Sequence, residues 1–207
     1  MKTQRRVFVM VLWTITAIAG CQFCDTGSHK RVEQMPSASL PAPTRSGIVA
    51  ITPVNSSIEF TGATALKSQV GHFAAFDGAI EMPSDDPKDA KIRVVVDMDS
   101  TTTSIGLLTR HLKGEDFFSV AKYPKAEFTS TVIAPGSEPG TYRVAGMLTL
   151  HGVQRSVECP ARITVTPAEV TFDGTLTIRQ TDFGMTESAR KTNDEVPVRI
   201  LIRGRRK

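Results

Sequence analysis

The chain has 207 residues, enough for one ordinary domain with additional segments, and 40% of them are hydrophobic while 22% are charged. This composition is typical of a globular protein and excludes a disordered chain, a collagen-like fibre and a polytopic membrane protein. Three of the 25 lysines and arginines lie in the first twenty residues, so residues 21–207 carry 22 basic and 21 acidic side chains. This balance predicts no nucleic-acid partner.

The first twenty residues have the parts of a secretion signal. Three basic residues come first, residues 7–19 are apolar apart from two threonines, and Gly20 and Cys21 follow. The apolar stretch is too short to span a bilayer comfortably. We therefore expect residues 1–20 to be a signal peptide.

Residues 18–21, Ile-Ala-Gly-Cys, resemble a bacterial lipobox, which predicts a lipoprotein-type signal with lipid attachment at Cys21. The alternative is an ordinary cut after Ala19. Acyl chains on Cys21 would contribute about 0.8 kcal/mol per buried methylene and anchor the protein to a membrane. Residues 21–46 carry Ser, Thr, Pro and scattered charges and are typical of a flexible tether. The expected location is the bacterial cell envelope, lipid-anchored and facing the periplasm, or secreted.

From residue 47 onward, apolar side chains recur at every second position, which is typical of half-buried strands. The pattern is clearest in two places. In residues 91–99 one face consists of Ile92, Val94, Val96 and Met98, and near the end of the chain one face consists of Val198, Ile200 and Ile202. Similar stretches occur at 57–66, 71–82, 126–134, 141–151, 153–166 and 169–180. About eight strands separated by turn residues predict an all-β fold, an antiparallel barrel or sandwich.

One segment has a helical pattern instead. In residues 104–114, Ile105, Leu108 and Leu112 form an apolar stripe at helical spacing. Ser104 is positioned to cap the start of this helix, and Gly114 its end. The sequence thus predicts one short helical connection between two strands.

Five short motifs in order resemble the YceI-like family of lipid- and polyisoprenoid-binding domains. They are HLKGEDFFSVAKYPKAEF at 111–128, GHFAAFDG at 71–78, LTLHGV at 148–153, DFGM at 182–185 and DEV at 194–196. The resemblance covers residues 48 to 202. It implies that residues 47–207 form a lipocalin-like antiparallel barrel around an apolar tunnel, which binds an isoprenoid-type or other long-chain lipid.

An apolar tunnel for such a lipid would be lined by large hydrophobic side chains, with polar groups at its mouth. The candidates for the lining are Phe60, Phe73, Phe76, Phe117, Phe118, Phe128, Leu148 and Phe183. The alternative for each is an ordinary role in a packed core. The head-group candidates on the helical connection are Arg110, His111 and Lys113, which could equally be solvated.

Other function classes find little support in the sequence. His72, His111 and His151 show neither the i, i+4 spacing nor a cysteine partner that a metal site favours. The chain has no Gly-x-Ser-x-Gly nucleophile elbow and no phosphate-binding glycine loop of the P-loop type. We therefore predict a protein that is not an enzyme, with no cofactor. The alternative to lipid binding is a surface adaptor or stress-related module with a filled core.

Overall fold

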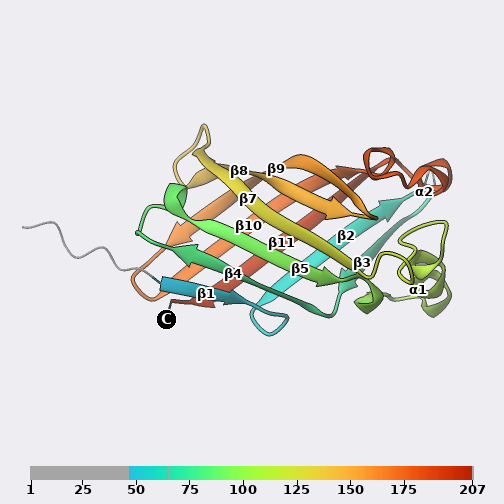
Figure 1. Cartoon of the computed structure of the whole chain (residues 1–207), viewed down its shortest axis with the longest axis horizontal. Helices are drawn as coiled ribbons and strands as arrows, with labels where there is room; N and C mark the ends of the chain where they lie inside the picture. The colour runs from blue at the N-terminus through green and yellow to red at the C-terminus, as the bar shows by residue number, and fades with distance from the viewer. Residues whose placement is uncertain (1–46, 65, 207) are drawn as a thin grey trace, which may run out of the picture. The chain divides into compact units, whose positions relative to one another are not determined.

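The computed structural model describes residues 47–64 and 66–206, apart from the side chain of Glu187. The expected signal peptide, the lipidated Cys21 and the tether lie outside these residues. The strands in chain order are β1 (Gly47–Ile51), β2 (Ser56–Ala63), β3 (Ser68–Phe73), β4 (Phe76–Met82), β5 (Lys91–Asp97), β6 (Thr101–Thr103), β7 (Lys125–Pro135), β8 (Thr141–Leu150), β9 (Val153–Val165), β10 (Glu169–Arg179) and β11 (Glu195–Arg205) (Figure 1).

Two α-helices and three 3-10 turns complete the described elements. They are α1 (Gly106–Lys113), α2 (Thr186–Lys191), η1 (Pro87–Asp89), η2 (Met98–Ser100) and η3 (Gln180–Phe183). Both α-helices lie at one end of the strands, which we call the helical end (Figure 1). The turn between β4 and β5, the turn between β9 and β10 and the end of β11 lie at the opposite end.

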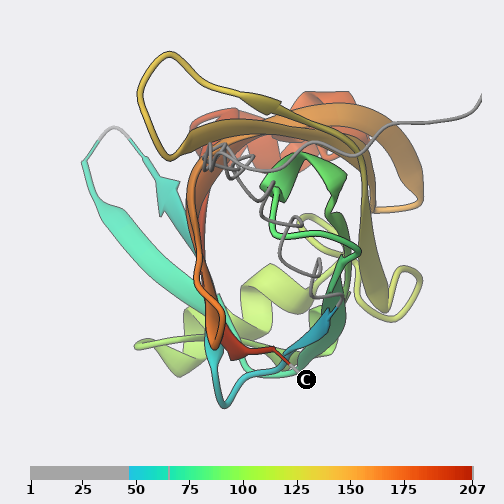
Figure 2. The same ribbon diagram turned by 90° about the vertical axis from the view of Figure 1, so that its left-hand side faces the viewer.

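The strands form one antiparallel sheet that curls into a barrel. Their order is β1-β4-β5-β7-β8-β9-β10-β11-β2-β3-β6. Only residues 74 and 75 separate β3 from β4, and η2 links β5 directly to β6. The strands β4 and β5 near one end of this order therefore continue into β3 and β6 at the other end. Seen end-on, the strands form a ring (Figure 2). The predicted all-β barrel is confirmed.

The strand count differs from the predicted eight for two local reasons. Two long strands are each divided, one between β3 and β4 and the other by η2, where Asp97 caps the turn by accepting a hydrogen bond from the Asp99 N–H (2.9 Å). In addition, β1 is a strand that the periodicity did not identify. Five residues are too short a stretch to stand out from the composition of the preceding segment.

Strand β1 fills the seam of the barrel beside β11. It pairs in register with β4, from Gly47 opposite Met82 to Ile51 opposite Gly78. On its other side it approaches β11 so closely that an added Cβ at Gly204 would lie 2.2 Å from Val49 Cγ1. The Asn55 amide donates to the Ala50 carbonyl (2.8 Å), and the Arg203 N–H donates to the Asn55 carbonyl (3.0 Å). Asn55 thus links β1 to β11, which are not joined by a continuous ladder of backbone hydrogen bonds.

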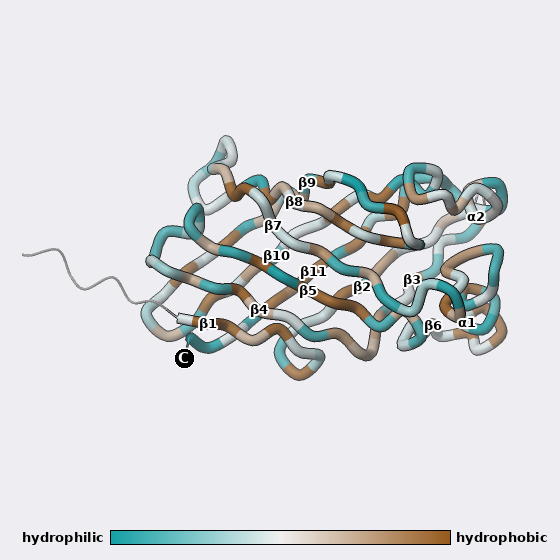
Figure 3. Tube along the Cα trace, viewed as in Figure 1, coloured by the Kyte–Doolittle hydropathy of each residue, from teal (hydrophilic) through white to brown (hydrophobic). Residues whose placement is uncertain are grey.

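Burial alternates along the strands as the sequence pattern predicts. In β1 the residues read buried, exposed, buried, exposed, buried, and the same period governs β8 and β10. Hydrophobic and hydrophilic residues accordingly follow one another along the traces of the strands (Figure 3). One face of every strand therefore points into the barrel.

The helical connection begins two residues later than predicted, and Ser104 does not cap it. Ile105 occupies the N-cap position and makes no side-chain cap hydrogen bond. The start of α1 is instead held to β6 by Thr109, whose hydroxyl accepts from the Thr103 N–H (2.9 Å). Gly114 does follow the last turn, but with an extended backbone (φ −70°) rather than a left-handed one.

Candidate functional site

A cavity of about 170 Å³ lies inside the barrel. This volume is more than ten times the roughly 10–15 Å³ that one buried water requires. Its wall is made by 27 residues: Ile58, Phe60, Gly62, Phe73, Ile92, Val94, Val96, Met98, Leu112, Phe117, Phe118, Ala126, Phe128, Val144, Leu148, Leu150, Cys159, Phe172, Leu176, Ile178, Gln180, Met185, Thr192, Val196, Val198, Ile200 and Ile202. Among these residues none is charged, so the interior is suited to an apolar occupant.

Six of the eight proposed lining residues border this cavity. They are Phe60, Phe73, Phe117, Phe118, Phe128 and Leu148. Phe76 and Phe183 are buried but lie outside the lining, where they pack in the core. The apolar residues predicted to share one face in 91–99 and at the end of the chain also all border the cavity, although their alternation predicted only a strand face: Ile92, Val94, Val96, Met98, Val198, Ile200 and Ile202.

The cavity is deep and runs along the barrel. On the β10 side its lining extends from Phe172 to Gln180, which corresponds to about 26 Å of chain at ~3.3 Å per residue. Strands in such barrels tilt by about 40°, so the depth along the axis is roughly 20 Å. The space is therefore long and narrow, as an extended hydrocarbon chain is.

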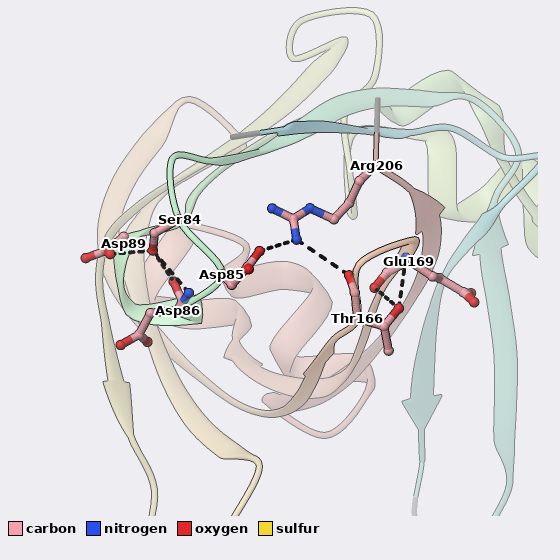
Figure 4. A network of polar contacts seen from close by, with 7 residues as sticks. All are labelled: Ser84, Asp85, Asp86, Asp89, Thr166, Glu169 and Arg206. Carbon is pink, nitrogen blue, oxygen red and sulfur yellow. Dashed lines mark hydrogen bonds and ion pairs between the residues drawn. The ribbon is translucent and has the colours of Figure 1, made fainter. Parts of the chain in front are cut away.

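Packed side chains close the cavity at the end opposite the helices. Val49, Ile80, Met82, Ile133 and Val170 are buried there and do not border the cavity. Beyond them, the side chain of Arg206 pairs with Asp85 from the turn after β4 (Figure 4). The Arg206 side chain is only 5% exposed, so its guanidinium covers this end of the barrel. The cavity approaches the surface at the helical end, where Gly62, Phe73 and Thr192 border it and are only partly buried.

An aromatic cluster stands near the helical end. The rings of Phe60, Phe73 and Phe118 lie 5.3 to 6.2 Å apart between centroids, in tilted and edge-on arrangements that aromatic pairs favour. An added Cβ at Gly71 would lie 2.2 Å from Phe60 Cζ. Gly71, the first glycine of the GHFAAFDG motif, therefore makes room for the ring of Phe60, and Phe73 of the same motif supplies a second ring of the cluster.

The polar side chains of the lining are already bonded within the protein. The Gln180 amide nitrogen donates to Thr192 Oγ1 (2.9 Å) and to the Asn193 carbonyl (2.6 Å), and its oxygen accepts from the buried Ser188 hydroxyl. These bonds tie η3 to α2 across the lip of the cavity. Because the amide is satisfied, it presents no unmet hydrogen-bonding requirement to a ligand.

Three of the sequence motifs meet beside this lip. Residues His151 and Gly152 form the two-residue turn between β8 and β9 with φ values of 52° and 75°, as a type I′ hairpin requires. The His151 ring packs on Tyr123 at 4.3 Å between centroids, and its Nδ1 is bonded to the Phe183 carbonyl (3.2 Å). Burial lowers the pKa of His151. The motifs therefore hold the helical end together.

The head-group candidates lie on α1, outside the cavity. Arg110 and His111 are exposed and border a shallow surface depression with Leu107, while the His111 ring also packs on Phe117 at 5.0 Å between centroids. The Lys113 ammonium pairs with Asp99 at 3.2 Å. Leu112, between them in sequence, borders the cavity. The helix thus has one side chain in the cavity wall and three basic groups outside it.

His72 and Cys159 lie on different strands, β3 and β9. His72 lies on β3, where its Nε2 is bonded to the Thr102 hydroxyl (2.7 Å), away from the His151 turn. Among the described residues, no group of three His, Cys, Asp or Glu side chains could hold a metal ion. Cys159 borders the cavity, and burial raises the pKa of its thiol to about 12.

A family model for the YceI-like domain matches residues 50–203. The chain belongs to the YceI-like family. A UPF0312 protein of Yersinia enterocolitica is 30% identical to this YceI-like chain over 140 residues, which cover 65% of this chain and 72% of the relative. A similar UPF0312 protein of Pectobacterium carotovorum is 30% identical over the same shares of both chains.

Solved structures have the same fold as this YceI-like domain. BcnA of Burkholderia cenocepacia has a TM-score of 0.67 at 24% identity, covering 74% of this chain and 99% of BcnA. A polyisoprenoid binding domain from Saccharophagus degradans, implicated in plant cell wall breakdown, has a TM-score of 0.63 at 16% identity. That match covers 79% of this chain and all of the other. The shared fold is an antiparallel barrel. Within the described part of this chain, no helix is long and apolar enough to cross a bilayer.

Proposed function

We propose that this protein binds a long apolar lipid, of isoprenoid type or with another extended hydrocarbon chain, in the cavity of its barrel. The observation that carries the proposal is the uncharged cavity bounded by 27 residues, which approaches the surface at the helical end and is closed at Arg206. Each methylene that moves from water into it contributes about 0.8 kcal/mol. The family match and the similarity to the polyisoprenoid binding domain of Saccharophagus degradans support the same ligand class.

The role that we propose is sequestration or transport without catalysis. The titratable side chains described above are dispersed rather than convergent, whereas an active site needs groups that meet around a reacting atom. The adaptor alternative required a filled core, and the cavity is inconsistent with that requirement. A polar head of the ligand would meet the mouth, where Arg110, His111 and Lys113 are the proposed contacts.

We further propose that the protein acts in the bacterial cell envelope, where residues 1–20 direct it and Cys21 carries the lipid anchor. The support is the lipobox-like sequence at 18–21. Mass spectrometry of the N-terminal peptide from the native host should find an acylated cysteine at position 21. A mature chain that starts at Gly20, with no acylation, would contradict the anchor and leave the cavity proposal unaffected.

The ligand proposal is tested by filling the cavity. Ala126 borders it, so Ala126→Phe places a ring in the space that the lipid would occupy. Organic extracts of the purified wild-type protein should contain a prenyl or acyl lipid, and extracts of the variant should contain much less. The matched control is Ala50→Phe, the same change on the exposed face of β1.

Two results would overturn the proposal. The first is a wild-type extract free of long-chain lipid together with no uptake of an added prenyl alcohol. The second is equal lipid content in the Ala126→Phe and Ala50→Phe variants. Circular dichroism and thermal unfolding of both variants separate loss of the ligand from loss of the fold.

A further inference from the structure

The loop between β2 and β3 presents an apolar side chain to solvent beside the mouth of the cavity. These two strands supply Phe60, Gly62 and Phe73 to the cavity wall. Between them, at the tip of the hairpin, Leu66 is 92% exposed. Isolated exposed leucines are common, so Leu66 indicates a binding surface only together with other exposed apolar residues around the mouth of the cavity, which we call the rim.

Helix α1 repeats the arrangement on another part of the rim. Its Leu112 borders the cavity, whereas Leu107 is 73% exposed and Ile105, at its N-cap, is 48% exposed. Strand β6, which leads into the helix, pairs with β3 from Phe73 to Gly71. Strand β6 thus joins α1 to the base of the hairpin, and both the hairpin and the helix have apolar side chains in the cavity wall and others in solvent.

We propose that this rim docks on a phospholipid bilayer, with Leu66, Ile105 and Leu107 inserted among the lipids, so that the cavity opens directly onto the acyl chains. The inference rests on the proposed function and names the surface from which the ligand is collected. A long-chain lipid is held in membranes, so a protein that takes it up must bring its cavity to the bilayer.

The charges on the rim fit an anionic lipid surface. Lys67 follows Leu66 directly, and α1 contains Arg110, His111 and Lys113, of which Lys113 is paired with Asp99. Basic groups near such a surface are each attracted to it, and apolar residues beside them insert. Two acids, Glu115 and Asp116, follow the helix, and Asp116 is paired with Lys191 at 2.5 Å.

The opposite end of the barrel carries charges of both signs, because Arg203 and Arg205 of β11 and Arg206 after it lie there. Its turn between β4 and β5 contains Asp85, Asp86 and Asp89, with Lys88 as the basic residue among them. Val54, in the turn between β1 and β2, is 96% exposed. Val54 therefore provides a matched control, because it is an exposed apolar residue that does not border the cavity.

The test places one fluorescent reporter on the rim and one outside it. The sequence contains a single tryptophan, Trp13, so a full chain with Trp13→Phe and Cys21→Ser has neither a second reporter nor an acyl anchor. Leu107→Trp and Val54→Trp are then compared on vesicles of phosphatidylethanolamine and phosphatidylglycerol, some with brominated acyl chains. Bromine quenches only a tryptophan that reaches the chains.

We expect quenching and a blue shift for Leu107→Trp and neither for Val54→Trp. We also expect Leu66→Asp with Leu107→Asp to weaken vesicle binding about tenfold or more. No quenching at position 107, or equal quenching at both positions, would overturn the proposal. Loss of a dimer in the aspartate variants without quenching would overturn it as well and assign the rim to a second copy of the chain.

These outcomes are distinguishable from failure of the proposed function. Lipid content in the extract reports on the cavity, whereas quenching reports on the end of the barrel that meets the bilayer. A chain that carries lipid but shows no quenching retains the function and loses the docking surface. A chain that is quenched but carries no lipid retains the docking surface and loses the proposed function.

Discussion

At the scale of single residues, the motifs of this chain are explained by close packing. Gly71 admits the ring of Phe60, and Gly152 combines a left-handed backbone with contact to Tyr123. The structure thus gives physical reasons for residue types that the sequence shows only as a pattern. Neither glycine borders the cavity.

Gly152→Ala should destabilise the protein. The residue has φ +75°, and an added Cβ would lie 2.5 Å from Tyr123 Cε1. We expect a loss of about 1–3 kcal/mol in the free energy of unfolding, measured with urea. Gly62→Ala is the control, because an added Cβ there meets nothing within 4 Å, and it should change stability by less than ~1 kcal/mol. Equal losses in the two variants would contradict this account.

The Cys159 thiol should be nearly inert in the folded protein. Burial raises its pKa from 9.0 to about 12, so in a Cys21→Ser, Cys24→Ser background its alkylation at pH 8 should be about a thousandfold slower than in urea. Because the folded pKa lies above the unfolded one, this thiol's contribution to stability is complete below pH 9 and is lost as the pH rises toward 12. Rapid alkylation at pH 8 without unfolding would contradict a closed cavity wall at Cys159.

At the scale of elements, the rim consists of separate segments joined by few polar contacts. Lys191 of α2 pairs with Asp116 of the loop after α1 and also lies 6.0 Å from the centroid of the Phe117 ring. The hydrogen bond from Lys191 lowers the pKa of Asp116, so this contact persists down to acidic pH, below the ordinary carboxyl value of 3.8. The contact spans the two helical segments that border the mouth.

Lys191→Met should speed lipid exchange more than it lowers stability. Exposed ion pairs contribute little to the folded state, so the midpoint of thermal unfolding should stay nearly unchanged. Release of a bound fluorescent fatty acid, followed by stopped flow, should become several-fold faster because α2 loses its tie to the neighbouring loop. The control is Lys88→Met, which removes a 2.9 Å pair with Asp86 at the opposite end. Equal release rates in both variants would show that α2 does not limit the exit.

The elements also show what the sequence could and could not predict. Alternation identified the long strands and placed Ile92, Val94 and Val96 on the face that borders the cavity. It could not identify β1 or α2, because five- and six-residue elements are held by tertiary contacts rather than by a local pattern. The break in one long strand arises from the Asp97 side chain at η2, which the alternation of apolar residues does not reveal.

At the scale of the whole molecule, a hollow barrel and a filled one have the same alternating pattern. Inward apolar residues are required in both cases, so the cavity depends on how the side chains are distributed along the axis. Here Val49, Ile80, Met82 and Val170 are packed at the end near Arg206 and do not border the cavity. For the same reason, Phe76 and Phe183 could not be separated from the lining residues by sequence.

The most direct test of the account is a crystal structure of the protein purified from its native host without detergent or added lipid. The account predicts continuous, elongated density along the cavity from Phe172 to Phe118, with no hydrogen-bond partners along its length. An empty cavity, or one that holds only a chain of ordered waters, would contradict the proposal that the barrel encloses a lipid.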